Sequence, residues 1–299
     1  MSALGRFTTA ERAAIAAIIL IWGINNIAAK VATNALPPLF VGGLRFAIAL
    51  VFLAPFLRPP FDWRRLAPIM LFAGPLHFAA VYGGFALTST VSAYVVSLQL
   101  WIPMTALAAW WILGERMPTA AIAGVAVAFV GVVWMTFDPA GGADPPAILV
   151  GLVGSAAWAL ATVLVRRSPS IRPLKLQALT SIAAAPALLG ASALFERDVP
   201  ARLTAAPPVF WVAMAWAGVV STVVATGLLF WLVQRREAGR VTPYLLLTPI
   251  VSAGLGVVVL GERLSMQVVL GGAATLAGVA IVSLAERARS GTPPVAAVE

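Results

Sequence analysis

Few residues of this chain carry groups that could do catalytic chemistry. Among 299 residues there is one histidine, His77, no cysteine, and only 11 acidic side chains. The long apolar runs contain no Asp or Glu except Glu115 and Glu262, which lie at the ends of two of them. This set leaves neither a nucleophile–base pair nor a cluster of metal ligands. We therefore expect a protein that is not an enzyme, has no cofactor or metal, and uses its polar side chains for binding.

The first apolar run contains polar side chains that are costly to bury. Trp22, Asn25 and Asn26 lie within the stretch IWGINNIAAK, and the residues 136 positions later include Trp158 and Thr162. An amide that leaves water needs a hydrogen-bond partner in its new surroundings. These side chains therefore form either hydrogen bonds between helices or part of a binding site, and both interpretations stay open.

A second set of candidates forms a stripe along one helix face. Tyr94, Ser97, Trp101 and Thr105 are separated by three, four and four residues, so a helix would place them on one face. The residues 147 positions later form a second stripe: Val241, Tyr244, Thr248 and Ser252. Hydroxyl groups are out of place on a surface that contacts lipid, so both stripes are expected to face the protein interior. They either line a binding cavity, which the large rings favour, or pack helices together through small polar groups.

Each stripe contains a proline that interrupts the helix. Pro103 removes the hydrogen bond to the carbonyl of Gln99, and Pro249 does the same for Leu245. A carbonyl freed in this way could accept a hydrogen bond from the ammonium group of a ligand. An ordinary kink, satisfied by a neighbouring Ser or Thr, explains the two prolines equally well.

Three isolated side chains complete the candidate binding residues. His77, beside Gly74 and Pro75, is expected to be a hydrogen-bond donor in the cavity, with a proton relay or a buried, bonded ring as alternatives. Arg45 lies six residues inside its apolar run. We expect its long side chain to reach back to the membrane interface, with binding of a carboxylate as the sharper alternative. Tyr82, in the same run as His77, is a further binding candidate.

The composition indicates what surrounds these candidates. Hydrophobic residues make up 61% of the chain and the mean hydropathy is +0.96, which is typical of a protein whose main solvent is lipid. A membrane-spanning helix needs roughly 20 apolar residues. Stretches that meet this criterion are 12–31, 39–57, 66–86, 91–113, 117–136, 147–166, 174–195, 209–233, 242–260 and 264–285. The sequence therefore predicts an all-α, polytopic membrane protein with ten transmembrane helices.

The basic residues predict how this bundle is oriented. Fifteen Lys and Arg side chains lie in segments on one side of the membrane, and only Lys30, Arg197, Arg202 and Arg263 lie on the other. Because basic loops stay in the cytoplasm, both termini are expected to be cytoplasmic. The same distribution accounts for the net charge of +9, so the expected partners are membrane lipid and a small molecule, not nucleic acid. We expect the protein to be a monomer.

A charged four-residue motif occurs twice in this chain. The letters LGER end apolar runs at Leu113–Arg116 and Leu260–Arg263, 147 residues apart. Glycines follow each Glu at spacings of nine and sixteen residues: Gly124 and Gly131 in the first copy, Gly271 and Gly278 in the second. Each copy contains five spans, so the second copy enters the membrane from the opposite side. The sequence therefore predicts two inverted five-helix repeats.

The boundaries of the repeats follow from this comparison. The first repeat is expected at residues 1–137, an outer linker at 138–146, the second repeat at 147–286 and a cytoplasmic tail at 287–299. The shift between the copies grows from 136 to 147, so about eleven extra residues are expected near Glu196–Pro208.

The Glu and Arg of each LGER are expected to cap and anchor the turn between the fourth and fifth helices. Direct contact with a substrate is the alternative.

These features resemble the drug/metabolite transporter superfamily, with two EamA-type domains that cover nearly the whole chain. The resemblance is carried by the five-span halves, Trp in the first helix, Pro in the fourth, and Leu-Gly-Glu followed by spaced glycines. The stretch SLQLWIPMT is also similar to the fourth helix of YddG-type amino-acid exporters, which read Leu-Trp-Pro. Here Ile102 stands between Trp101 and Pro103. The resemblance implies export of small metabolites, amino acids first among them, across a bacterial inner membrane.

We therefore expect an exporter of neutral or aromatic amino acids that works by alternating access, with gates at the bent third, fourth, eighth and ninth helices. Because the spans contain no acidic residue away from their ends, facilitated diffusion is expected rather than tight proton antiport. A multidrug or nucleotide-sugar carrier of the same superfamily is the alternative within transport. A membrane-embedded enzyme or a lipid-translocating scaffold is the alternative from another class.

Overall fold

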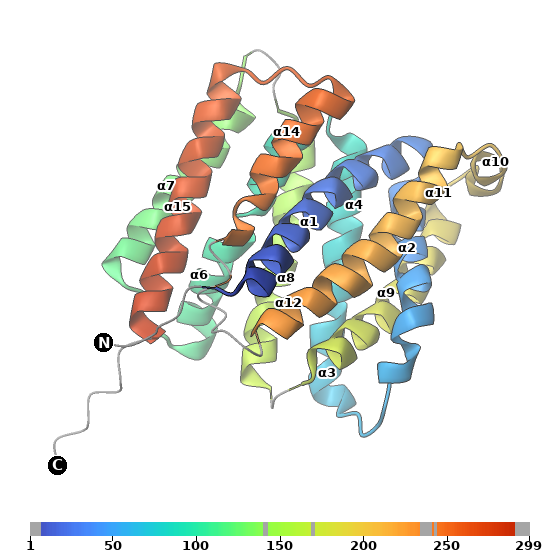
Figure 1. Ribbon diagram of the computed structural model, residues 1–299, viewed down its shortest axis with the longest axis horizontal. Coiled ribbons are helices and arrows are strands. Elements are labelled where there is room, and N and C mark those ends of the chain that lie inside the picture. Colours follow the sequence, from blue (N-terminus) through green and yellow to red (C-terminus); the bar gives the residue numbers. More distant parts are fainter. Residues whose placement is uncertain (1–6, 140–142, 169–170, 234–240, 242–243, 291–299) are drawn as a thin grey trace.

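The structure is a computed structural model that describes residues 7–139, 143–168, 171–233, 241 and 244–290. All secondary structure of these residues is helical (Figure 1). Nine of their helical spans are long and apolar enough to cross a membrane, and one further apolar helix is shorter. The predicted all-α, polytopic fold is therefore confirmed.

The first repeat contains five spans, three of which are built from more than one helical element. Its elements are α1 (Thr9–Ala35), α2 (Pro38–Leu53), η1 (Ala54–Phe56), α3 (Trp63–Leu71), η2 (Phe72–Leu76), α4 (His77–Leu87), α5 (Val91–Leu98), α6 (Trp101–Leu113) and α7 (Thr119–Thr136). The helix α1 begins earlier than expected because Thr8 and Glu11 form a capping box, in which each side chain bonds the other residue's backbone N–H.

The second repeat follows the same order. Its elements are α8 (Pro145–Arg167), α9 (Pro173–Phe195), α10 (Val199–Thr204), α11 (Pro208–Ala215), η3 (Trp216–Ala225), α12 (Thr226–Val233), α14 (Thr248–Leu260) and α15 (Met266–Ser290). The short helix α10 occupies the loop in which the sequence placed the extra residues. Part of the ninth expected span, 242–260, lies outside the described residues.

The third span of each repeat contains a π-helical stretch, η2 in the first and η3 in the second. Both stretches include a glycine that allows close approach to the other repeat. A Cβ at Gly74 would lie 3.3 Å from the carbonyl oxygen of Thr180 in α9, and a Cβ at Gly218 would lie 3.1 Å from that of Arg45 in α2. The third span of each repeat therefore packs against the second helix of the other.

The fourth span of each repeat is interrupted at the same place. Gln99 and Leu100 form a turn between α5 and α6, and Leu246 and Leu247 form a turn directly before α14. Each turn precedes a helix with a proline in its first turn, where the missing N–H is tolerated. The predicted span over 91–113 is therefore present, and the interruption expected near Pro103 lies at Gln99 and Leu100.

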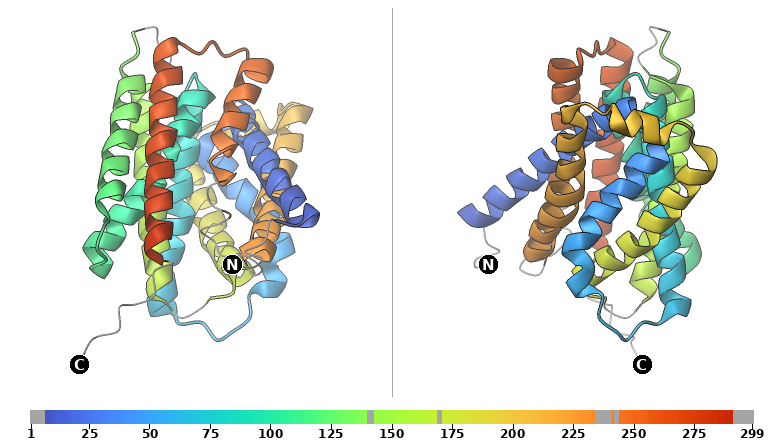
Figure 2. Two further views of the ribbon diagram at one scale, coloured as in Figure 1. Left: turned by 60° about the vertical axis from the view of Figure 1, so that its left-hand side comes forward. Right: turned by 90° about the vertical axis from the view of Figure 1, so that its right-hand side faces the viewer.

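The two copies of LGER end these broken spans in the same way. Gly114 and Gly261 have φ values of 68° and 69°, in the left-handed region that terminates helices and favours glycine. The chain then turns into α7 and α15. These two helices share the most extensive contact among the described elements (Figure 2).

The glycines that follow each LGER explain this contact between α7 and α15. A Cβ at Gly131 would lie 2.6 Å from the carbonyl oxygen of Gly271, and a Cβ at Gly124 would lie 2.7 Å from that of Gly278. The spacing that repeats in the sequence thus places small residues of the two repeats opposite one another. Such residues allow transmembrane helices to approach closely.

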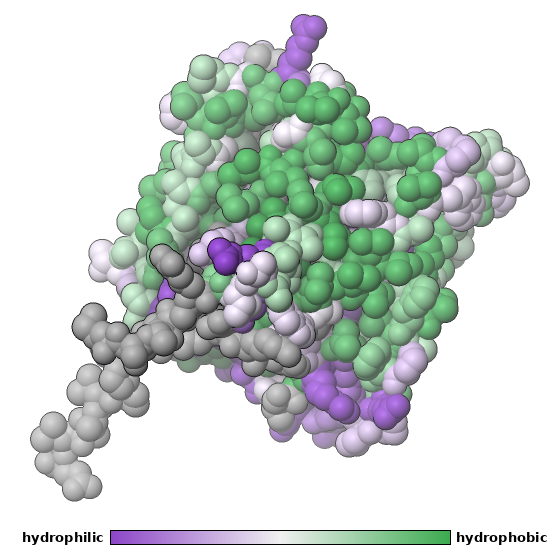
Figure 3. Space-filling model, viewed as in Figure 1, coloured by the Kyte–Doolittle hydropathy of each residue, from purple (hydrophilic) through white to green (hydrophobic). Residues whose placement is uncertain are grey.

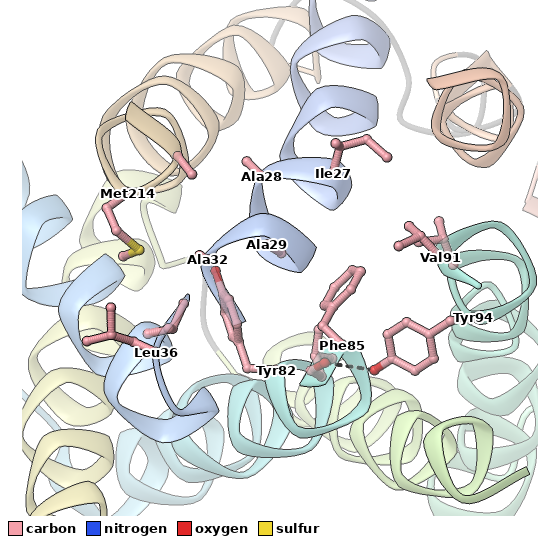
Figure 4. Packing of buried hydrophobic residues seen from close by; sticks show 14 of the residues in the cluster. Ile27, Ala28, Ala29, Ala32, Leu36, Tyr82, Phe85, Val91, Tyr94 and Met214 are labelled. Atoms are coloured by element: carbon pink, nitrogen blue, oxygen red, sulfur yellow. Dashed lines mark hydrogen bonds between the residues drawn. The ribbon is translucent and has the colours of Figure 1, made fainter. Parts of the chain in front are cut away.

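The largest buried cluster lies where α1, α4 and α5 meet (Figure 4). Tyr82, Phe85 and Tyr94 are at most 2% exposed and belong to this cluster. On the outside of the molecule, apolar residues cover the middle of the face seen in Figure 3, and hydrophilic residues gather toward its ends. This distribution fits a protein surrounded by lipid.

Candidate functional site

Arg45 lies buried between the two repeats, with 9% of its surface exposed. Its Nε donates a hydrogen bond of 2.9 Å to Thr222 Oγ1, and its Nη1 donates one of 3.2 Å to the hydroxyl of Tyr82. Its Nη2 donates a longer bond of 3.4 Å to Ser221 Oγ. The guanidinium therefore joins α2 and α4 of the first repeat to η3 of the second.

The prediction that Arg45 reaches back to the membrane interface is wrong. Its side chain instead runs inward, because hydroxyl groups of η3 and α4 and two aromatic rings surround the guanidinium. The guanidinium carbon lies 5.3 Å from the ring centroid of Phe78 and 5.8 Å from that of Phe46. Within the described part of the chain no carboxylate forms an ion pair with Arg45. A positive charge is thus buried among uncharged partners.

Two partners of Arg45, Ser221 and Thr222, were not among the residues that the sequence singled out. Both are buried within η3, and Thr222 Oγ1 also donates to the carbonyl of Ala217, five residues earlier. A π-helical stretch shifts the side chains that follow it around the helix axis and is often found at functional sites. The available signal was a pair of adjacent hydroxyls in an otherwise apolar span, AGVVSTVVA.

His77 lies at the start of α4 and contacts the second repeat. Its Nδ1 is 2.8 Å from the carbonyl oxygen of Gly154 in α8, so Nδ1 carries the hydrogen of this bond. In the neutral ring Nε2 is then a hydrogen-bond acceptor. The sequence analysis expected His77 to donate a hydrogen bond in the cavity, whereas the hydrogen of Nδ1 is directed at Gly154. The His77 ring also contacts Trp158 and Phe78, with centroid distances of 4.8 Å and 4.6 Å. Phe78 therefore contacts both His77 and Arg45.

The stripe predicted on the fourth helix of the first repeat is not one continuous face. Tyr94 and Ser97 are fully buried in α5, where the Tyr94 hydroxyl donates to the carbonyl of Val81 and Ser97 Oγ donates to that of Tyr94. Figure 4 shows Tyr94 packed beside Phe85. Both hydroxyl groups therefore donate to backbone carbonyls within the first repeat, and their role in binding stays a prediction.

The other half of this stripe lies in α6, beyond the turn. Trp101 is half-buried there, and Thr105 Oγ1 donates to the carbonyl of Trp101. The Gln99 carbonyl, which the sequence expected to be freed by Pro103, accepts a hydrogen bond of 3.1 Å from the N–H of Ile102. This hydrogen bond spans three residues instead of four, and it gives the Gln99 carbonyl the partner that Pro103 cannot supply.

The second stripe is also divided. Val241 is buried, whereas Tyr244 is 46% exposed and packs edge-to-face against Phe7 at a centroid distance of 5.5 Å. Thr248 is buried, and its hydroxyl has no hydrogen-bond partner among the described residues. Ser252 donates to the carbonyl of Gly23 in α1.

The polar residues of the first helix have different roles. Asn26 donates through Nδ2 to Ser252 Oγ at 2.9 Å, which is the hydrogen bond between helices that the sequence left open. Asn25 is buried, and its Oδ1 has no partner within the described part of the chain. Trp22 is half-buried in a cluster with residues of α12, and Thr162 Oγ1 donates to the backbone carbonyl of Trp158 in its own helix α8. The structure thus leaves the side chain of Asn25 as the polar group of this set that needs a partner.

The two LGER glutamates bond to opposite repeats. Glu262 accepts hydrogen bonds from the backbone N–H groups of Val91 and Ser92, at 2.6 Å and 3.2 Å, and from the Ser92 hydroxyl. It therefore caps α5 of the first repeat, not the turn of its own repeat as expected. Glu115 forms an ion pair of 2.7 Å with Arg166 at the end of α8.

Further carboxylates and one lysine close the same end of the molecule as Glu262. Asp144 accepts hydrogen bonds from the backbone and hydroxyl of Ser89, and Lys30 donates to the carbonyls of Phe85 and Thr88. Glu196 accepts from the first two N–H groups of α2, at 2.7 Å and 2.9 Å. Carboxylates of the linker and second repeat thus accept hydrogen bonds from N–H groups of the first repeat, and Lys30 of the first repeat donates to carbonyls at the end of α4.

Comparison with known proteins identifies the fold. Residues 12–137 and 145–284 each match the model of the EamA-like transporter family. A "Probable amino-acid metabolite efflux pump" of Escherichia coli is 25% identical over 283 residues, which cover 88% of this chain and 91% of that protein. A protein of the same name from Salmonella typhimurium is 26% identical over 278 residues, covering 88% of this chain and 91% of that protein.

Two further proteins extend the comparison. An "Uncharacterized inner membrane transporter" of Escherichia coli is 24% identical over 268 residues, covering 84% of this chain and 83% of that one. One solved crystal structure has a TM-score of 0.63 at 20% identity and covers 96% of this chain and 100% of that one, which shows the shared fold. The chain belongs to the EamA-like transporter family, within the drug/metabolite transporter superfamily, and is a multi-pass membrane transporter.

Proposed function

We propose that this transporter exports small neutral or aromatic amino acids across a bacterial inner membrane by alternating access, and that Arg45 binds the substrate carboxylate. The observation that carries the proposal is the guanidinium itself, which is buried between the repeats and, among the described residues, donates hydrogen bonds to three hydroxyl groups. Two relatives named as probable amino-acid metabolite efflux pumps support the substrate class.

A carboxylate suits the environment of Arg45 for two reasons. First, a buried charge without a counter-charge is unfavourable, and a carboxylate would supply the missing negative charge. Second, the guanidinium has five N–H donors in a planar fork, and three are used by Tyr82, Ser221 and Thr222. The remaining donors could bond a carboxylate in a charge-assisted way.

His77 is the proposed partner for the substrate ammonium group. Its Nδ1 donates to Gly154, so Nε2 of the neutral ring can accept a hydrogen bond from the ammonium. Its ring and the guanidinium of Arg45 both contact Phe78, which places the two groups around one side chain. An amino acid carries a carboxylate that suits Arg45 and an ammonium group that suits His77, both on the same carbon atom.

We propose that transport is facilitated diffusion, and the positions of the acidic residues support this mode. Acidic residues of the described spans lie near helix termini, as with Glu11 in α1 and Glu286 in α15, and not beside Arg45. A coupling ion is therefore not part of the proposal, and the substrate gradient drives transport. Movement of the repeats against one another would open Arg45 to each side in turn.

The experiment is export from proteoliposomes that contain the purified protein. Radiolabelled leucine and phenylalanine would be compared with their amides, which keep the ammonium group but lack the carboxylate. We expect wild type to export the acids and to discriminate about 10- to 100-fold against the amides, the value of a charge-assisted hydrogen-bonded pair. Arg45→Gln should export the acids more slowly by a similar factor and lose the discrimination.

Arg64→Gln is the matched control, because Arg64 is an exposed arginine at the start of α3. It should behave as wild type. Gel filtration and thermal unfolding would establish that both variants fold. Equal export of acids and amides by wild type, a result that does not depend on any variant, would contradict the assignment of Arg45.

A further inference from the structure

A pocket of 520 Å³ lies at the inner end of the bundle, away from Arg45. Its walls come from both repeats: from the end of the second span of the first repeat, and from the start of α9 and from α12 in the second. The side chains that matter for its chemistry are Phe56, Arg58, Arg172, Leu174, Lys175 and Trp231. This end of the molecule is the one predicted to face the cytoplasm.

The polar wall of this pocket is strongly basic. Arg58, Arg172 and Lys175 line it, and none of the described residues in its wall is acidic. Among the described residues, Arg58 and Lys175 donate hydrogen bonds only to backbone oxygens, those of Pro55 at 3.2 Å and Pro60 at 2.9 Å. Within the described residues, none of the three cations forms an ion pair. Three positive charges around one cavity repel one another, and a bound anion would remove that cost.

The remaining wall is apolar and adjoins exposed apolar side chains. Phe56, Leu174 and Trp231 line this side of the pocket, and Phe56 is 40% exposed. The preceding turn of α2 continues the apolar surface, since Val51 is 73% exposed and Phe52 is 50% exposed. An anion that fits the whole pocket therefore carries an apolar chain, which a soluble phosphate or carboxylate lacks.

We infer that this pocket binds an anionic phospholipid from the surrounding leaflet. The phosphate lies among Arg58, Arg172 and Lys175, and an acyl chain follows Phe56 onto the exposed surface of α2. Basic pockets between transmembrane helices on the cytoplasmic side recognise such headgroups through the same combination of charge and apolar contact. A lipid in this position contacts both repeats and so stabilises the arrangement of their inner ends.

Native mass spectrometry of the delipidated full-length protein tests this inference. Phosphatidylglycerol, which is anionic, and phosphatidylcholine, which is zwitterionic, would be titrated separately. We expect one tightly held phosphatidylglycerol per protein, and at least ten-fold weaker binding of phosphatidylcholine. The triple variant Arg58→Gln, Arg172→Gln, Lys175→Gln should bind phosphatidylglycerol about 100-fold more weakly, since each basic residue near a membrane surface contributes roughly 1 kcal/mol.

The control removes the same charge from the same end of the protein but outside the pocket. This control is a second triple variant, with Arg64→Gln, Arg116→Gln and Arg287→Gln combined. It should retain the bound phosphatidylglycerol. An equal loss in both triple variants would show a general surface attraction and overturn the pocket. If the first triple variant does not fold, the single variant Arg172→Gln should still weaken binding about five-fold. No change in that variant would equally overturn the inference.

Two further arms identify the source of the anion and its place. A large excess of inorganic phosphate should not displace the phosphatidylglycerol, whereas displacement would show a site for soluble anions and overturn the lipid assignment. A phosphatidylglycerol with a photoreactive headgroup should label the peptides that contain Arg58 and Arg172. Labelling confined to other peptides would refute the site. None of these outcomes depends on amino-acid transport, so the proposed function can fail while this inference stands.

Discussion

The carboxylate of Glu262 in the second repeat caps α5 of the first, through the backbone N–H and the hydroxyl of Ser92. The adjacent N–H of Val91 donates to the same carboxylate at 2.6 Å. Such bonds compensate for the unpaired N–H groups of a helix start, and the negative charge favours the positive end of the helix dipole. Movement of α5 away from Glu262 would break all three bonds, so this contact joins the two repeats at one end of the bundle.

Loss of the Glu262 charge should therefore make this end of the bundle more accessible. We expect Glu262→Gln to raise the rate at which a cysteine at Thr90 is labelled by a hydrophilic maleimide. Thr90 is 8% exposed in this structure. Weakening the charge-assisted bonds by about 1.5–3 kcal/mol predicts an increase of roughly 10- to 100-fold if opening limits labelling. Glu196 caps α2 at the same end, so Glu196→Gln is the control and should leave the labelling rate at Thr90 unchanged. An equal rise in labelling in this control would contradict a specific role of Glu262.

The orientation of the protein can be tested with single cysteines. Arg202 in α10 and Arg64 in α3 are both exposed and lie at opposite ends of the bundle. From the distribution of basic residues, a cysteine at Arg202 should be labelled from outside intact cells and one at Arg64 only after permeabilisation. Ala143, which the sequence also suggests as an outer position, is 8% exposed and is a poor probe. Labelling of the Arg64 position in intact cells would invert the predicted topology.

Transport should be passive. An imposed pH gradient should leave counterflow of a neutral amino acid largely unchanged, because no acidic side chain lies near Arg45 or His77 among the residues with described contacts. His77→Ala should raise the half-saturation concentration without abolishing flux, since it removes a hydrogen-bond acceptor for the substrate. Proton-driven uptake that disappears in His77→Ala would instead show that His77 couples transport to protons.

Trp101 should affect substrate preference if it lines the cavity. Burying a large apolar side chain contributes about 1.5–3 kcal/mol, so Trp101→Ala should raise the half-saturation concentration for large amino acids roughly 10- to 100-fold. Small amino acids should be affected less. Trp110→Ala is the control, because Trp110 is 56% exposed on the same helix, α6. If both variants reduce folded yield and neither changes preference, Trp101 acts in packing.

The contact between α7 and α15 should depend on its glycines. Gly131→Ala should lower the thermal unfolding midpoint, because its Cβ would lie 2.6 Å from the carbonyl oxygen of Gly271 and the helices would have to separate. Overpacking of this kind costs about 1–3 kcal/mol. Gly254→Ala in α14 is the control, since a Cβ there meets no atom within 4 Å. An unchanged midpoint for Gly131→Ala in detergent would show that the contact tolerates a wider separation.

Much of the fold could be predicted from the sequence because its determinants are local. A run of apolar residues specifies a span by its length, and a glycine after Leu specifies the end of a helix by its left-handed φ. The repeat of LGER, with Gly124 and Gly131 matched by Gly271 and Gly278, also predicted two related halves. In the structure these glycines lie opposite one another and allow α7 and α15 to approach closely.

The partners of polar side chains could not be predicted in this way. Arg45 is bonded to Thr222, which is 177 residues away in the chain, and Glu262 caps a helix start 170 residues before it. Both contacts exist only once the two repeats are packed together. For the same reason, the Gln99 carbonyl that a continuous helix would leave free is bonded in a turn. The sequence by itself determined the spans, their number and the two related repeats, because apolar length and helix-ending residues act locally. Only the tertiary structure decided which buried polar groups meet, because each such group takes whichever partner the packing of distant helices brings within hydrogen-bond distance.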